Sequence, residues 1–95
     1  MRDYEMVMII SPDVAEEDVP GTIDKVSDFI TSKGGEVTQI DRWGKKKMAY
    51  PINRFSEGNY VVSRFKIEPG MTTELEASLK ITEQILRHML VRLGE

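Results

Sequence analysis

The spacing of the apolar residues switches between two periods along this chain, and the switching restricts the fold more than any other feature. Residues 4–10 (YEMVMII) and 59–67 (NYVVSRFKI) are rich in β-favouring residues and stop at Pro12 and Pro69, which predicts two strands. Side chains alternate along a strand. One face of each predicted strand therefore carries these residues: Tyr4, Met6, Met8 and Ile10 in the first, and Val61, Phe65 and Ile67 in the second.

Residues 19–30 have the spacing of a helix that buries one stripe, because their apolar residues recur every three or four positions. Asp18 precedes this segment and is expected to cap the helix. Pro20 falls in the first turn, where its missing N–H donor has little effect. Gly34 and Gly35 follow and are expected to supply a left-handed stop.

Residues 71–80 are expected to form a second helix, in which Thr73 and Glu76 match a capping box. Residues 81–93 keep the helical spacing without Gly or Pro, so the pattern alone also allows one long helix. We assign residues 85–93 to a strand, partly because the strand at 4–10 otherwise lacks a second neighbour.

Residues 36–52 are expected to be extended, with an interruption at Gly44. The segment ends near Pro51, which has no backbone N–H to donate to a neighbouring strand. Val37 and Ile40 break strict alternation, and a bulge near Gly44 would reconcile them. The order is then strand, helix, strand, strand, helix, strand. This order predicts one α+β domain over residues 1–95, with the split βαβ or ferredoxin-like arrangement: a four-stranded antiparallel sheet with two helices on one face.

Composition argues against several functional classes. The chain has no cysteine, and His88 is its single histidine, so neither a disulfide framework nor a zinc site is expected. No nucleophile has a base beside it, and no glycine-rich loop follows the first strand. We therefore expect no catalytic activity, no metal and no cofactor. With no long apolar segment, a cytoplasmic location is expected.

The charges are distributed unevenly, although the net charge is only −3. Residues 13–28 contain six acids and one base, whereas residues 42–56 contain five bases and no acid. Charges separated by more than about 8 Å are largely screened at physiological salt. We therefore expect the basic segment to face phosphate while the acids face water elsewhere. The alternative is a basic turn that is merely solvated.

Aromatic residues interleave with the bases of this segment. Arg42, Lys45, Lys46 and Lys47 are suited to neutralising phosphates, and Trp43 or Tyr50 offers a flat face to an unstacked base. The alternative is that both aromatic rings pack against a helix.

The sheet face opposite the helices is expected to be too apolar to stay wet, which predicts a docking surface for a protein or for RNA. A homodimer is the alternative. The apolar residues of this face are Val7, Ile9, Tyr60, Val62, Met89 and Val91, and they lie among Glu5, Arg64, Lys66 and Arg87.

Residues 43–53, WGKKKMAYPIN, resemble the signature of ribosomal protein six of the bacterial small subunit. Residues 1–5, the Val-Pro-Gly at 19–21 and the Gly-x-Tyr at 58–60 extend the resemblance over nearly the whole chain. The family has the ferredoxin-like fold, which implies a strand for the last segment.

The resemblance also implies a structural role in the small ribosomal subunit. The partners would be the central domain of 16S rRNA and ribosomal protein eighteen. The chain would bind the RNA as a heterodimer with ribosomal protein eighteen during platform assembly, and that protein is a candidate occupant of the apolar face. By resemblance, the RNA contacts would be Arg2, Lys45, Lys46, Lys47, Tyr50, Asn53 and Arg54, with Arg87 and Arg92.

Two rival classes remain. A generic RNA-recognition domain would carry stacking aromatics on its third strand, but of its pattern only Gly58 is matched in residues 57–61. A metabolic sensor or small enzyme would need a convergent polar pocket, which the sequence does not indicate.

Overall fold

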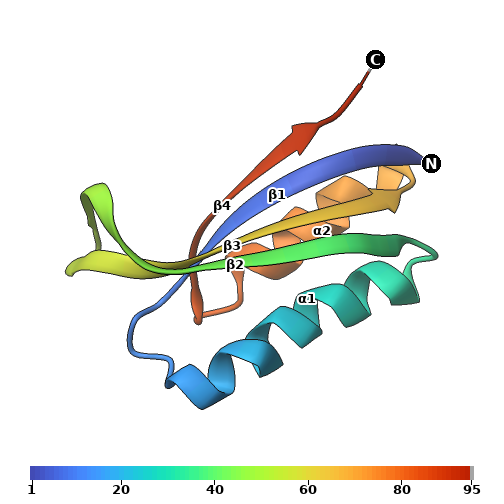
Figure 1. The fold of residues 1–95 in the computed structure, drawn as a ribbon. Helices are drawn as coiled ribbons and strands as arrows, with labels where there is room; N and C mark the ends of the chain where they lie inside the picture. The colour runs from blue at the N-terminus through green and yellow to red at the C-terminus, as the bar shows by residue number, and fades with distance from the viewer. Residues whose placement is uncertain (95) are drawn as a thin grey trace.

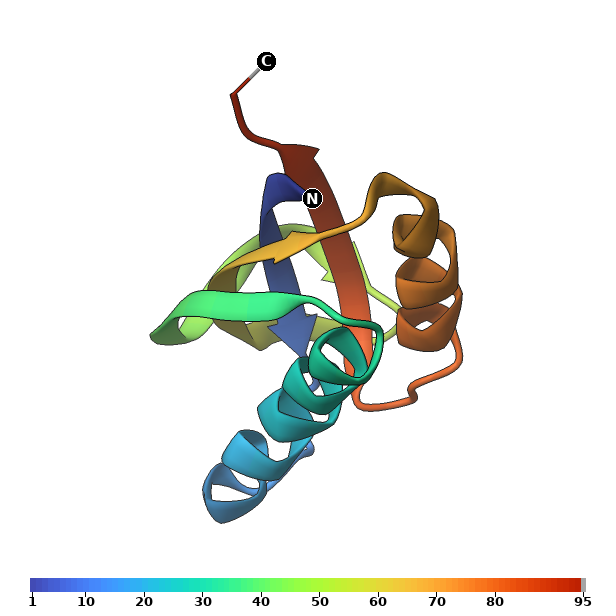
Figure 2. The same ribbon diagram turned by 90° about the vertical axis from the view of Figure 1, so that its right-hand side faces the viewer.

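The computed structural model describes residues 1–94, which form one antiparallel sheet and two α-helices (Figure 1). The sheet order is β2-β3-β1-β4. Both helices lie on one side of the sheet (Figure 2), so the ferredoxin-like prediction is confirmed. The strands are β1 (Arg2–Ile10), β2 (Glu36–Ile52), β3 (Phe55–Ile67) and β4 (Ile85–Arg92); the helices are α1 (Val19–Ser32) and α2 (Thr72–Lys80), preceded by the short 3-10 turns η1 (Glu16–Asp18) and η2 (Pro69–Met71).

The core lies between the helices and one face of the sheet, as alternation predicts. The even-numbered residues of β1 from Tyr4 to Ile10 are all buried there, and Phe65 of β3 is buried beside them. The Tyr4 and Phe65 rings stack with centroids 5.9 Å apart. On this face the strand residues pack against the apolar stripe of α1 and two leucines of α2, namely Val19, Ile23, Val26, Ile30, Leu75 and Leu79.

The ends of α1 differ from the expectation. Asp18 occupies the N-cap position, but its side chain makes no capping hydrogen bond, because η1 already places its backbone in the helical region. Gly34 supplies the left-handed stop with φ 84°, whereas Gly35 does not adopt positive φ. Gly35 is needed for space instead: a Cβ there would stand 2.6 Å from the carbonyl oxygen of Lys66.

The capping box expected for α2 is wrong. Because η2 leads directly into α2, Thr73 lies inside the helix, and the residue at the N-cap position is Met71, without a side-chain capping bond. Glu76 points to β4, where its Oε1 lies 3.0 Å from Nε2 of His88. The alternative of one long helix is also excluded, since β4 follows α2 as a strand paired with β1.

Strand β2 is continuous but irregular. A register shift at Arg42 and Gly44, with Gly44 at φ 84°, confirms the bulge expected there. The shift that reconciles Val37 with Ile40 is a different one, between Val37 and Gln39. Strand β3 begins at Phe55, four residues earlier than expected.

The far end of β2 and the start of β3 form an arm, which we define as residues 45–58. Strand β1 ends opposite Asn59, so the arm lies past the part of the sheet that β1 covers. It projects beyond the helices in Figure 1. The turn at its tip is Asn53-Arg54, with Asn53 at φ 57°, a conformation that Asn tolerates better than most residues. Within residues 1–94, neither helix has the length and hydropathy of a membrane span.

Candidate nucleic-acid interface

The three lysines at the base of the arm are exposed on strand β2. Among the described residues, none of the three forms an ion pair. The Lys46 ammonium lies 5.1 Å from the centroid of the Trp43 ring. Lysines that form no ion pair keep more of their attraction for phosphate, although Lys47 lies opposite Glu57 in the β2–β3 ladder. Because side chains alternate along a strand, Lys45 and Lys47 point to one side of β2 and Lys46 to the other, where it lies over Trp43.

Neither aromatic residue of the segment packs against a helix, so that alternative is wrong. Trp43 is 53% exposed and Tyr50 is 55% exposed. The Tyr50 hydroxyl accepts a hydrogen bond from the guanidinium of Arg87, whose carbon lies 5.6 Å from the Tyr50 ring centroid. Since Arg87 pairs with Ile9 across β1 and β4, this contact ties the arm to the sheet face opposite the helices.

A mainly apolar cavity of about 210 Å³ lies where the arm meets this face. Met48, buried to 7% exposure, anchors the irregular stretch of the arm there. Gly58 makes the approach possible, because a Cβ at this position would stand 2.3 Å from Cγ2 of Ile9. The cavity is lined by Val7, Ile9, Met48, Ala49, Tyr50, Ile52, Tyr60, Arg87, His88 and Met89.

The acids and bases are less separated than the charge pattern suggests. Nη2 of Arg42 lies 2.7 Å from Oε2 of Glu16, and Nη2 of Arg54 lies 3.8 Å from Oδ2 of Asp13. Two members of the acidic segment thus lie against two members of the basic segment. The expectation that the acids face water elsewhere is wrong for these two, because the chain between β1 and α1 returns to the edge where β2 and the arm lie.

The remaining predicted RNA contacts fall into two groups. Asn53 and Arg54 form the tip of the arm, and Arg87 joins them through Tyr50. Arg2 and Arg92 lie at the other end of the sheet, at the start of β1 and the end of β4. The structure, 36 Å long, does not bring these two arginines together with the arm.

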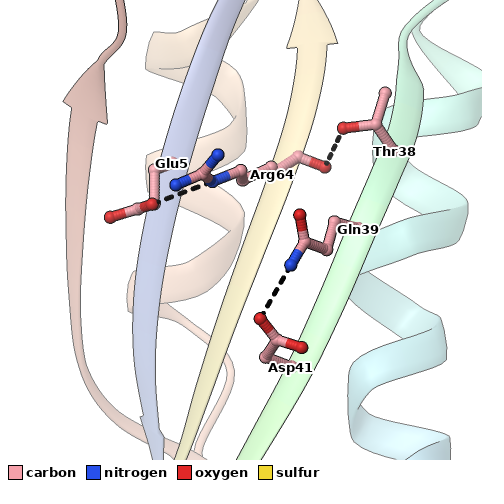
Figure 3. Close-up of polar contacts among 5 residues, drawn as sticks. All are labelled: Glu5, Thr38, Gln39, Asp41 and Arg64. Carbon is pink, nitrogen blue, oxygen red and sulfur yellow. Dashed lines mark hydrogen bonds and ion pairs between the residues drawn. The ribbon is translucent and has the colours of Figure 1, made fainter.

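We call the sheet face opposite the helices the open face. Met89 and Val91 are its most exposed predicted apolar members, at 54% and 44%, whereas Ile9 and Val62 are enclosed to 8% and 9% by their neighbours. The Glu5 carboxylate accepts a hydrogen bond of 3.0 Å from Nε of Arg64 in the adjacent strand (Figure 3). The predicted face therefore exists, with an ion pair on its two central strands among the apolar side chains.

Strand β2 adds three residues to the open face that pattern reasoning missed. Gln39 pairs with Arg64 across β2 and β3, and Asp41 pairs with Val62. Gln39 donates a 2.8 Å hydrogen bond to Asp41 (Figure 3). Trp43 lies beside Val62 at the same face. The bulge between Val37 and Gln39 shifts the parity of the strand, and no residue type at that position signals it.

Comparison with known proteins identifies the relationship. The family model described as "Ribosomal protein S6" matches residues 3–92. The chain belongs to this family. The small ribosomal subunit protein bS6 of Desulforamulus reducens is 46% identical over 95 residues, which is the whole of both chains. That of Moorella thermoacetica is 43% identical over 95 residues, covering 100% of this chain and 97% of the relative.

Solved structures agree with the family. The crystal structure of 30S ribosomal protein S6 from Thermotoga maritima superposes with a TM-score of 0.91 at 33% identity, covering 97% of this chain and 87% of that one. The C-terminal domain of the MgtC protein from Mycobacterium tuberculosis gives a TM-score of 0.60 at 14% identity. The second likeness shows the shared fold alone.

Proposed function

We propose that this member of the ribosomal protein S6 family binds the central domain of 16S rRNA together with ribosomal protein eighteen during assembly of the platform. Membership of the family makes the chain a structural, non-enzymatic protein of the small ribosomal subunit in the cytoplasm. Binding of ribosomal RNA within that particle follows. The central domain and the partner are the finer part of the proposal.

The lysine triplet is the observation that carries the RNA contact. Lys45, Lys46 and Lys47 are consecutive and exposed on an arm that projects from the body, and none of them is in an ion pair among the described residues. Lysines that neutralise phosphates release condensed counterions, which is the main source of sequence-independent affinity. An arm that projects can reach a groove that the body of the domain cannot enter.

The aromatic residues support the same contact. Trp43, with Lys46 over its ring, presents an exposed face on which an unstacked base can lie. Tyr50 is held by Arg87, so its ring is oriented before RNA arrives. Asn53 and Arg54 extend the contact surface to the tip of the arm, and Arg2 and Arg92 would form a separate contact at the other end of the sheet.

The open face supports a protein partner. Met89 exposes apolar surface at the cavity under the arm, and Val91 exposes it beside Glu5, whose ion pair with Arg64 joins the two central strands. Protein interfaces combine such apolar side chains with polar and charged ones. We assign ribosomal protein eighteen to this face.

The test of the RNA contact is the salt dependence of binding. Changing Lys45, Lys46 and Lys47 together to Ala should weaken binding to a central-domain RNA fragment and reduce the slope of log K against log salt by up to about three phosphate equivalents. The matched control removes three other exposed lysines that lie outside the arm and the open face, Lys25, Lys33 and Lys80. Equal slopes for the two triple variants would contradict the assignment.

A further inference from the structure

Two carboxylates lie beside arginines of the proposed RNA contact. Glu16 pairs with Arg42 on β2, and Asp13 lies against Arg54 at the tip of the arm. Both arginines belong to the basic segment, and both acids belong to the connection between β1 and α1. The distances between the charged atoms are 2.7 Å and 3.8 Å. A phosphate that approaches either guanidinium can use its other N–H groups, but it meets the repulsion of the nearby carboxylate.

The connection that carries these acids is structured by its own hydrogen bonds. The N–H of Asp13 donates to the hydroxyl of Ser11 at 3.1 Å, and the N–H of Ser11 donates to the carbonyl of Gln84 at 2.8 Å. The N–H of Asp18 donates to the carbonyl of Ala15 at 2.8 Å, within the turn that holds Glu16. The acids are thus placed by folded backbone on both sides, and little entropy is lost when they meet the arginines.

We propose that Asp13 and Glu16 are internal competitors of RNA phosphate that lower the affinity of this protein for RNA at Arg42 and Arg54. The inference rests on the proposed RNA contact of the arm and assigns two acidic residues a part in tuning it. The basic segment then has two kinds of base: three lysines outside any ion pair of the described residues, and two arginines whose attraction for phosphate is weakened by a nearby carboxylate.

The physical consequence is a loss of both affinity and salt dependence at the two arginines. A base that already lies beside a carboxylate has given up part of its attraction for phosphate. When RNA displaces the carboxylate, the freed acid gathers a cation from solution, which offsets the counterion released from the RNA. Arg42 and Arg54 therefore add less to the salt slope than the lysines do. RNA that binds only through its phosphate backbone therefore gains little affinity from Arg42 and Arg54.

The test is a pair of double variants with the same change in net charge. In Asp13→Asn with Glu16→Gln, both competitors lose their charge and keep their shape. In Glu17→Gln with Asp18→Asn, two neighbouring exposed acids lose theirs; among the described residues, neither is in an ion pair. Binding of a twelve-nucleotide oligouridylate and of the central-domain fragment is measured at several salt concentrations.

The competitor variant should bind the oligouridylate about twofold to tenfold more tightly than the wild type at low salt, as two exposed ion pairs allow. Its salt slope should steepen by up to about two phosphate equivalents. The control variant should change the affinity less than about twofold, through the screened field of the whole molecule alone. Equal gains for the two variants would overturn the proposal, because net charge would then explain both.

A second readout follows the displacement itself. In the wild type, the side-chain carboxyl carbon resonance of Glu16 should move on addition of RNA toward its position in an Arg42→Gln variant. A resonance that stays in place while RNA binds would overturn the competition at Arg42. If neither the wild type nor the variants bind either RNA, the RNA contact of the arm fails, and the competitors fail with it. If RNA binds but the two double variants gain equally in affinity, only the role of Asp13 and Glu16 as competitors fails.

Discussion

The two faces of the sheet are made by the same strands, and they differ in what covers them. On the helix side, Met6 and Phe65 are 0% and 1% exposed. On the open face, Met89 and Val91 are 54% and 44% exposed, although they are equally apolar. Successive residues of one strand thus serve the core and the proposed interface in turn. Substitutions at neighbouring positions should therefore separate stability from docking.

The largest effect is expected in the core. Phe65→Ala should lower the free energy of unfolding by about 3–5 kcal/mol, because a large side chain is removed from a packed site that cannot collapse fully. Its neighbour Arg64, which faces the other way, is the control: Arg64→Ala should cost about 1 kcal/mol or less. Urea denaturation measures both. Similar losses at the two positions would contradict the two-faced sheet.

A smaller effect is expected where the arm meets the open face. Gly58→Ala places a methyl group against Ile9 and should destabilise the protein by about 1–3 kcal/mol through overpacking. Gly21→Ala is the matched control, because its Cβ would meet nothing within 4 Å and it lies in helix α1. That change should stabilise the protein by up to about 1 kcal/mol. In thermal unfolding, Gly58→Ala should lower the melting temperature and Gly21→Ala should raise it.

Met89→Asp tests the open face as a docking surface. Because Met89 is 54% exposed, its replacement should change the free energy of unfolding by less than about 0.5 kcal/mol. Binding of ribosomal protein eighteen, measured by titration calorimetry, should weaken at least about tenfold, since a charge is placed in an apolar contact. Met89 is a cleaner probe than Val62, which is 9% exposed. Unchanged binding would remove Met89 from the interface.

The smallest effect is expected in the helix layer, at Thr73. A capping threonine replaced by Ala would cost about 1 kcal/mol. Thr73 lies inside α2 after the turn η2, so Thr73→Ala should change stability by less than about 0.5 kcal/mol. A loss near the capping value in urea denaturation would restore the capping box that the sequence suggests.

Periodicity predicts which strand residues face the core, but it does not predict the last strand or where each helix starts. The core residues of β1 and β3 follow from alternation alone, because burial on one face selects every second residue. The last strand does not: β4 has helical spacing, and the family resemblance assigns it correctly. A 3-10 turn precedes each helix: at α1 it leaves Asp18 at the N-cap position without a capping bond, and at α2 it places Thr73 inside the helix.

The sequence predicts which residue types make up the candidate site, but not how they contact distant parts of the chain. The basic and aromatic residues of the arm stand together in the sequence, so their exposure side by side follows from a projecting hairpin. The pairing of Glu16 with Arg42 joins residues 26 positions apart and depends on the path of the chain after β1. The placement of Trp43 on the open face depends on the bulge between Val37 and Gln39, which shifts the parity of β2.

We propose that the arm and the open face act together, the arm on RNA and the open face on a protein partner. Titration calorimetry with a central-domain fragment of small-subunit ribosomal RNA, with and without ribosomal protein eighteen, at two salt concentrations, tests it most directly. The partner should strengthen binding, and salt should weaken it. No binding in either case, or binding that ignores both partner and salt, would contradict it.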